Sequence, residues 1–197
     1  MSPFGRSLAA AASFLHRWSA LPLHADLWPP RHREALCALY REGYARVTPS
    51  DALGHHLTLT RSGRGLIGVS TPHEPRETSR ALGFLGYLAA GHLAARGYLR
   101  ARRCAPRRYA WVLFRPDGKT ALLLVGHRRL PEGYRDLLNV PSACLRTGEG
   151  VLHERAFVFV PGGRKPRGPT QLEVEPLMKE PALLAWLEHA RQLTAPC

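Results

Sequence analysis

The sequence predicts an α+β protein made of two parts. Residues 30–67 have the pattern of a helix followed by two short extended segments. Residues 109–127 have the pattern of two strands joined by a Pro-Asp-Gly turn, and residues 180–194 that of an amphipathic terminal helix. We therefore divide the chain into a first domain at 1–70, a linker at 71–77 and a second, α/β domain at 78–197. A chain of 197 residues can supply two small cores.

The elements of the first domain are predicted from the spacing of apolar residues and from the prolines and glycines that bound each segment. Residues 6–20 carry apolar side chains three and four positions apart, which predicts an amphipathic helix. Residues 21–28 lie between prolines and predict a short second helix. Pro30 begins a third helix, and Gly43 ends it, because glycine readily adopts the left-handed conformation of a helix end. Residues 55–60, HHLTLT, predict a strand that runs into the turn RSGRG.

Two short helices, a third helix and a β-hairpin form the order of a winged helix-turn-helix. Cationic side chains on the third helix and on the hairpin suit a DNA duplex, since the helix can enter the major groove while the hairpin contacts flanking phosphates. In this arrangement Arg33 is a candidate for reading a base edge, and Arg61 and Arg64 for holding the backbone. The full set of candidate DNA contacts is Arg31, His32, Arg33, Arg41, His55, His56, Arg61 and Arg64.

The positive charge is unevenly spread along the chain. The formal net charge is +13, with 16 arginines against 6 acidic residues up to residue 109 and 12 basic against 9 acidic residues beyond it. A basic N-terminal half is typical of a polyanion-binding module. The alternative is that arginine is abundant because of genomic base composition, since lysine is scarce. Composition alone does not separate the two interpretations, and the clustering of basic residues on the hairpin favours nucleic acid.

Two segments carry a resemblance to a known family. The pattern LxxLYxxGY at residues 36–44, followed by HxLTLTxSGRxLI at residues 55–67, resembles the winged-helix half of replication-relaxation-type plasmid proteins. Many small winged-helix regulators share its ending of Leu-Thr, two residues and Gly, here Leu59, Thr60 and Gly63. The resemblance implies a transcription regulator, or a plasmid or phage replication accessory protein, that binds double-stranded DNA as a homodimer. A protein-interaction role for the winged helix is the alternative if its third helix is covered in a dimer.

The second domain resembles the restriction-endonuclease-like core that follows the winged helix in the same family. Active enzymes of that kind hold a divalent metal with an Asp and with a Glu-x-Lys on the next strand. Asp117 matches the Asp position, but residues 121–127 contain no carboxylate. A metal-dependent nuclease acting on DNA or RNA through Asp117 is thus the alternative function. We favour a structural role for Asp117 in a tight turn, no enzymatic activity, and a scaffold, dimerisation or partner-binding role for this domain.

Other segments of the second domain give further expectations. Three glycines within the helix predicted over 78–96 favour close packing against another helix, either in the core or in a second protomer. The arginine-rich residues 100–108 are expected to form a solvated loop, which adds phosphate contacts if it lies beside the hairpin. Residues 132–145 predict a helix and residues 151–163 a strand.

No pattern for a metal or a cofactor is present in the sequence. The four cysteines lie far apart without a CxxC pair, and His55 and His56 are adjacent, which on a strand sends them to opposite faces. A phosphate-binding loop and a dinucleotide fingerprint are both missing. No stretch reaches the roughly 18 apolar residues of a membrane span. We expect a cytoplasmic protein without metal or cofactor that does not bind membranes. Whether duplex DNA or structured RNA is bound stays open.

Overall fold

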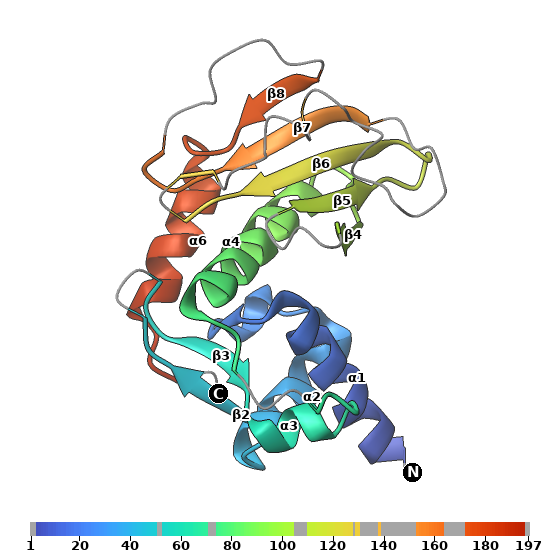
Figure 1. The fold of residues 1–197 in the computed structure, drawn as a ribbon, viewed down its shortest axis with the longest axis vertical. Coiled ribbons are helices and arrows are strands. Elements are labelled where there is room, and N and C mark those ends of the chain that lie inside the picture. The colour runs from blue at the N-terminus through green and yellow to red at the C-terminus, as the bar shows by residue number, and fades with distance from the viewer. Residues whose placement is uncertain are drawn as a thin grey trace. The chain divides into compact units, whose positions relative to one another are not determined.

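The fold is of the mixed α+β class that the sequence predicts (Figure 1). The computed structural model describes residues 3–50, 53–70, 74–104, 110–127, 129–130, 138, 153–163 and 172–195. The chain divides into two compact units: unit 1 comprises Met1–Phe84 and Leu187–Cys197, and unit 2 comprises Leu85–Trp186. Their extents differ from the predicted domains, because residues 71–84 and the end of the terminal helix belong to unit 1.

Unit 1 combines helices with a small antiparallel sheet. Its elements are α1 (Pro3–Trp18), β1 (Leu21–Pro22), the 3₁₀ helix η1 (Ala25–Leu27), α2 (Pro30–Arg41), β2 (Ala45–Thr48), β3 (His56–Leu59) and α3 (Arg61–Gly65). The strands lie in the order β1-β3-β2, and both pairings are antiparallel. The first helix, the helix beginning at Pro30 and both extended segments are confirmed.

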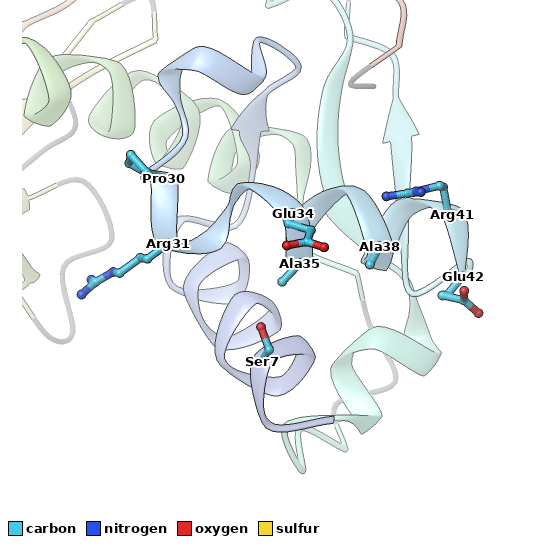
Figure 2. A pocket seen from close by; sticks show the side chains of 8 residues that line it. All are labelled: Ser7, Pro30, Arg31, Glu34, Ala35, Ala38, Arg41 and Glu42. Atoms are coloured by element: carbon cyan, nitrogen blue, oxygen red, sulfur yellow. The ribbon is translucent and has the colours of Figure 1, made fainter. Parts of the chain in front are cut away.

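Apolar side chains at helical spacing hold α1 and α2 together. The buried side of α1 consists of Leu8, Ala11, Ala12, Leu15 and Trp18. On α2, Ala35, Leu36 and Leu39 are buried, and Ala35 points toward Ser7 of α1 (Figure 2). Gly43 follows α2 with a φ of 73°, which is the left-handed conformation expected at its end. The two helices thus share one apolar seam, and the opposite side of α2 faces solvent.

Two predictions for unit 1 are wrong. Residues 21–28 form β1 and η1 rather than a helix, because Leu21 and Pro22 pair with β3 and Trp28 Nε1 donates a hydrogen bond to the Pro22 carbonyl at 2.8 Å. Pairing with a distant strand here overrides the local helix tendency. The predicted RSGRG turn is helix α3, whose start is capped by Thr60 Oγ1, which accepts a hydrogen bond from Gly63 N at 3.2 Å.

Helix α4 (Glu77–Ala94) confirms the helix predicted over 78–96. Its glycines were expected to pack against another helix, and Gly83 does so, whereas Gly86 packs against a side chain of a strand. In unit 1, a Cβ at Gly83 would lie 1.6 Å from the carbonyl oxygen of Trp18, the last residue of α1. In unit 2, a Cβ at Gly86 would lie 2.6 Å from the ring of Trp111. Both positions therefore require a residue without a side chain.

Unit 2 is organised around a five-stranded mixed sheet. Its strands are β4 (Arg100–Arg103), β5 (Ala110–Phe114), β6 (Thr120–Val125), β7 (His153–Phe159) and β8 (Glu173–Pro176), and α6 (Pro181–Gln192) follows them. The strands lie in sequence order, with antiparallel pairing from β4 to β6 and parallel pairing from β6 to β8. The predicted β5–β6 hairpin, the β7 strand and the terminal helix are confirmed.

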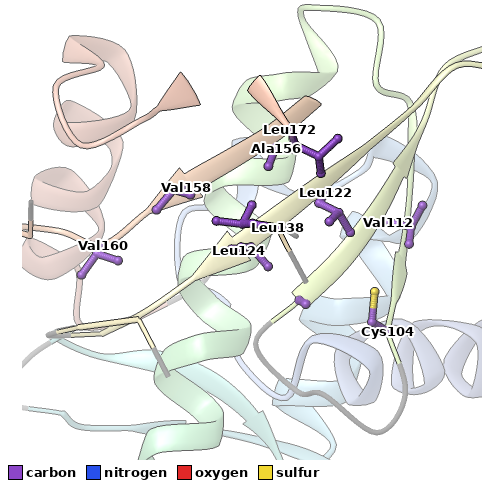
Figure 3. Packing of buried hydrophobic residues seen from close by; sticks show 10 residues of the cluster. Cys104, Val112, Leu122, Leu124, Leu138, Ala156, Val158, Val160 and Leu172 are labelled. Atoms are coloured by element: carbon purple, nitrogen blue, oxygen red, sulfur yellow. The ribbon is translucent and has the colours of Figure 1, made fainter. Parts of the chain in front are cut away.

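One face of this sheet carries a closely packed apolar cluster (Figure 3). The buried members are Cys104, Ala110, Val112, Leu122, Leu124, Leu138, Ala156, Val158, Val160 and Leu172. The helix predicted over 132–145 lies outside the described residues except for Leu138, which is helical and buried.

Strand β4 replaces the first part of the loop predicted at residues 100–108, and residues 105–109 lie outside the described part. Its arginines fit a strand because their guanidinium groups stack on neighbouring rings. The guanidinium of Arg100 lies 5.7 Å from the ring centroid of Phe114, and that of Arg103 lies 5.7 Å from the ring of Trp111. The aromatic side chains of β5 therefore stabilise an arginine-rich edge strand.

The glycines of α4 give a matched stability test. Replacing Gly83 with Ala should destabilise the protein by about 3 kcal/mol, because the Trp18 carbonyl is backbone and cannot rotate away. Replacing Gly91 with Ala should stabilise it by up to about 1 kcal/mol, since the nearest atom to a Cβ there is 3.9 Å away and Ala is the better helix former. Urea unfolding followed by circular dichroism measures both, and equal effects would contradict the packing described.

Candidate nucleic-acid interface

The solvent-facing side of α2 borders a shallow groove of about 570 Å³ (Figure 2). The groove is lined by Ser7 of α1 and by Pro30, Arg31, Glu34, Ala35, Ala38, Arg41 and Glu42. The small side chains among them are Ser7, Ala35 and Ala38. The four charged side chains belong to α2 and to Glu42, the residue that follows it. This groove is the candidate site, because it concentrates accessible donors and acceptors on one element.

The helical repeat places these charges in a row. Arg31, Glu34, Ala38 and Arg41 are separated by three, four and three residues, so they share one side of α2. Figure 2 shows Arg31 and Arg41 near opposite ends of the helix with Glu34 between them. None of the three charged side chains forms an ion pair within the described part of the chain. Their charges are therefore available to a ligand.

Two other predicted contacts on α2 are engaged elsewhere in unit 1. Arg33 Nη1 lies 3.3 Å from Asp26 Oδ1 of η1, so its charge is already paired. His32 stacks on Phe14 of α1 with ring centroids 4.8 Å apart. Burial, followed by the nearby charges of Arg31 and Arg17, lowers the pKa of His32 below its ordinary value. Arg33 and His32 thus do not line the groove.

His56 does not have the predicted role of a cationic contact on the hairpin. Its side chain is 0% exposed, and it lies on the central strand between Pro22 of β1 and Thr48 of β2. Burial lowers the pKa of His56 to about 4, and the Gly54 carbonyl, 3.3 Å from Nδ1, opposes this shift only in part. The ring is therefore neutral near pH 7 and does not present an exposed cation on the hairpin.

Arg64 is also buried, with 3% of its surface exposed, and its Nη1 donates a hydrogen bond to the Leu59 carbonyl at 3.2 Å. This differs from the exposed position expected for a contact with the DNA backbone, because the side chain joins α3 to β3. Arg61, one turn earlier on α3, is exposed, and His55 is half-buried. Of the predicted hairpin set, Arg61 is thus the accessible cation.

The hairpin end is also covered. A Cβ at Gly54 would lie 2.6 Å from the Cα of Arg191 on α6, so the terminal helix packs directly on this loop within unit 1. His189 of the same helix lies against His24, with ring centroids 4.6 Å apart. A free, basic wing is therefore not available in the described part of unit 1.

The two units of the structure divide the positive charge differently from the two halves of the sequence. Unit 1 contains 11 arginines and 7 acidic residues, whereas unit 2 contains 17 basic and 8 acidic residues. Most of the surplus thus belongs to unit 2. Part of that charge is internally paired: Arg155 lies 3.3 Å from Glu175, and Arg96 contacts Glu175 and lies 3.1 Å from Glu180.

Asp117 lies in the exposed turn between β5 and β6. Its Oδ1 accepts a hydrogen bond from Lys119 N at 3.2 Å, and its Oδ2 lies 3.1 Å from Arg115 Nη2. These contacts match the turn role favoured by the sequence. No group of three His, Cys, Asp or Glu side chains able to hold a metal occurs among the described residues.

Comparison with known proteins gives no relative: no family model, curated protein or solved structure matches this chain. Within the described segments, none of the helices combines the length and apolar character needed to cross a membrane.

Part of the groove lining can be read from the sequence and part cannot. Helical spacing alone places Glu34 and Ala38 beside Arg31 and Arg41, but attention to positive charge left Glu34 out of the candidate set. Ser7 gave no signal, because its position in the groove depends on how α1 crosses α2.

The buried His56 ring makes stability depend on pH. Because its pKa is about 4 in the folded protein and about 6.5 when unfolded, the unfolded chain binds more protons between these values. Stability should therefore fall as pH drops from 6.5 to 4, by roughly 3 kcal/mol from this residue. A His56→Leu variant should lack this component, while His55→Leu should keep it. Urea titrations across this range measure the slopes, and equal slopes in wild type and His56→Leu would refute the assignment.

Proposed function

We propose that unit 1 binds duplex DNA through the solvent-facing side of α2. The element order α1, β1, η1, α2, β2, β3 with the sheet order β1-β3-β2 supports a winged helix-turn-helix in which η1 replaces the second helix. In that fold the helix preceding the hairpin enters the major groove. The helix in this position is α2, whose outer side carries charges that have no ion-pair partner in the described part of the chain.

The observation that carries the proposal is the pair of accessible arginines at the two ends of one exposed helix. An α-helix with its side chains is about 10–12 Å across and the major groove is about 12 Å wide, so the exposed side of α2 can enter it. Arg31 and Arg41 can donate bidentate hydrogen bonds to guanine or to phosphate. Ala38 between them keeps the helix surface narrow. Arg61 supplies a further phosphate contact from α3.

The proposed cellular role follows the family resemblance, and is that of a transcription regulator or replication accessory protein acting as a homodimer. In unit 2 the antiparallel β4–β6 sheet followed by parallel β7 supports a restriction-endonuclease-like core. Strand β6, TALLLV, offers no carboxylate for a metal. Unit 2 is accordingly proposed as a scaffold whose net positive charge strengthens attraction to nucleic acid.

Removing both arginines tests the proposal. The Arg31→Ala, Arg41→Ala double variant should bind a duplex at least tenfold more weakly, since each good arginine contact contributes roughly 1–3 kcal/mol. Fluorescence anisotropy with labelled duplex, single strand and RNA of equal length, at several salt concentrations, measures the loss. Arg76→Ala, which removes one exposed positive charge outside α2, is the control for each single arginine variant and should lose less than about threefold from long-range electrostatics alone. Equal affinities for wild type and the double variant would refute the role of α2.

A further inference from the structure

An acidic side chain occupies the middle of the proposed DNA-binding side of α2. Glu34 is exposed, lines the groove and has no ion-pair partner among the described residues. Arg33, its neighbour in sequence, is paired with Asp26 instead. A carboxylate here would be repelled by DNA phosphates, so a surface used only to hold the backbone does not require it.

The edges of base pairs in the major groove do complement this row of charges. The cytosine amino group is a donor that a carboxylate accepts, guanine offers two acceptors to arginine, and the thymine methyl contacts small apolar side chains. We propose that Glu34 is a specificity-determining residue that accepts a hydrogen bond from a cytosine amino group in the bound duplex. This inference rests on the proposed function and adds the base that the site selects.

Helix geometry sets the spacing of these contacts. Arg31 and Glu34 are three residues apart, which is about 4.5 Å along the axis, close to the 3.4 Å rise of one base pair. The two side chains can therefore contact the guanine and the cytosine of the same or of adjacent pairs. Arg41 lies about 15 Å from Arg31 along the helix, so the row spans roughly four base pairs.

A second copy of the chain is the competing occupant. Two antiparallel α2 helices would bring Arg31 of each copy near Glu42 of the other, with Ala35 and Ala38 at the centre. Stable protein interfaces, however, bury about 800 Å² per partner around large anchoring side chains. The groove presents only Ser, Ala and Pro as its uncharged residues. Its composition therefore favours base edges over a protein partner.

Selection from duplexes with a randomised ten-base-pair centre, using the full chain, tests the inference. Wild type should prefer cytosine at one position, and Glu34→Gln should reduce that preference by about tenfold, because the amide presents a donor as well as an acceptor. Glu188→Gln removes the same charge from α6, outside the groove, and should retain the preference. Both positions are exposed, and circular dichroism confirms that each variant is folded.

The possible outcomes separate the two proposals. Duplex binding by wild type with an unchanged cytosine preference in Glu34→Gln would overturn the role of Glu34 alone. Failure of wild type to bind any duplex would overturn both proposals. Sedimentation velocity tests whether a second copy occupies the groove. In that case Glu42→Arg should dissociate a wild-type dimer, and adding Arg31→Glu to this variant should restore the dimer. Such a result would show that the groove binds a second copy and would refute the role in base recognition.

Discussion

Burial of strand β3 is the constraint on which the rest of unit 1 depends. All four of its residues are buried, and β1 and β2 pair with its two edges. Thr58 and Thr48 share a hydrogen bond of 2.7 Å across the β2–β3 pair. Because β1 must reach one edge and β2 the other, the intervening helix α2 has to cross the unit between them. That crossing buries Leu36 and Leu39 and leaves the opposite side of α2 in solvent.

The burial of β3 also determines which cationic side chains can contact a ligand. A residue on β3 is enclosed whatever its chemistry, so His56 is kept neutral, and Arg64 satisfies the carbonyl of Leu59 at the end of the strand. Among the described residues, charge without an ion-pair partner is left on α2 instead. The number of arginines in a segment is therefore a poor guide to a binding surface, since ion pairs, cation–π contacts and buried hydrogen bonds employ many of them.

The sequence allowed several elements of unit 2 to be predicted for a simple physical reason. The β5–β6 hairpin depends on a local turn, in which Asp117 accepts a hydrogen bond two residues on, and turn chemistry is readable from neighbouring residues. Strand β4 could not be predicted, because an arginine-rich segment becomes a strand only when Phe114 and Trp111 lie beside it. The exposed positions of α2 were likewise predictable from helical periodicity, whereas Ser7 of the groove was not.

By itself, the sequence determined the α+β class, the helices at α1, α2, α4 and α6, and the β2–β3 and β5–β6 strand pairs. These features follow from spacing, proline and glycine, all of which act over a few residues. Only the tertiary structure decided that residues 21–22 form a strand, that His56 and Arg64 are enclosed, and that α6 covers the hairpin at Gly54. Burial depends on which distant segments come together, and no local pattern records that.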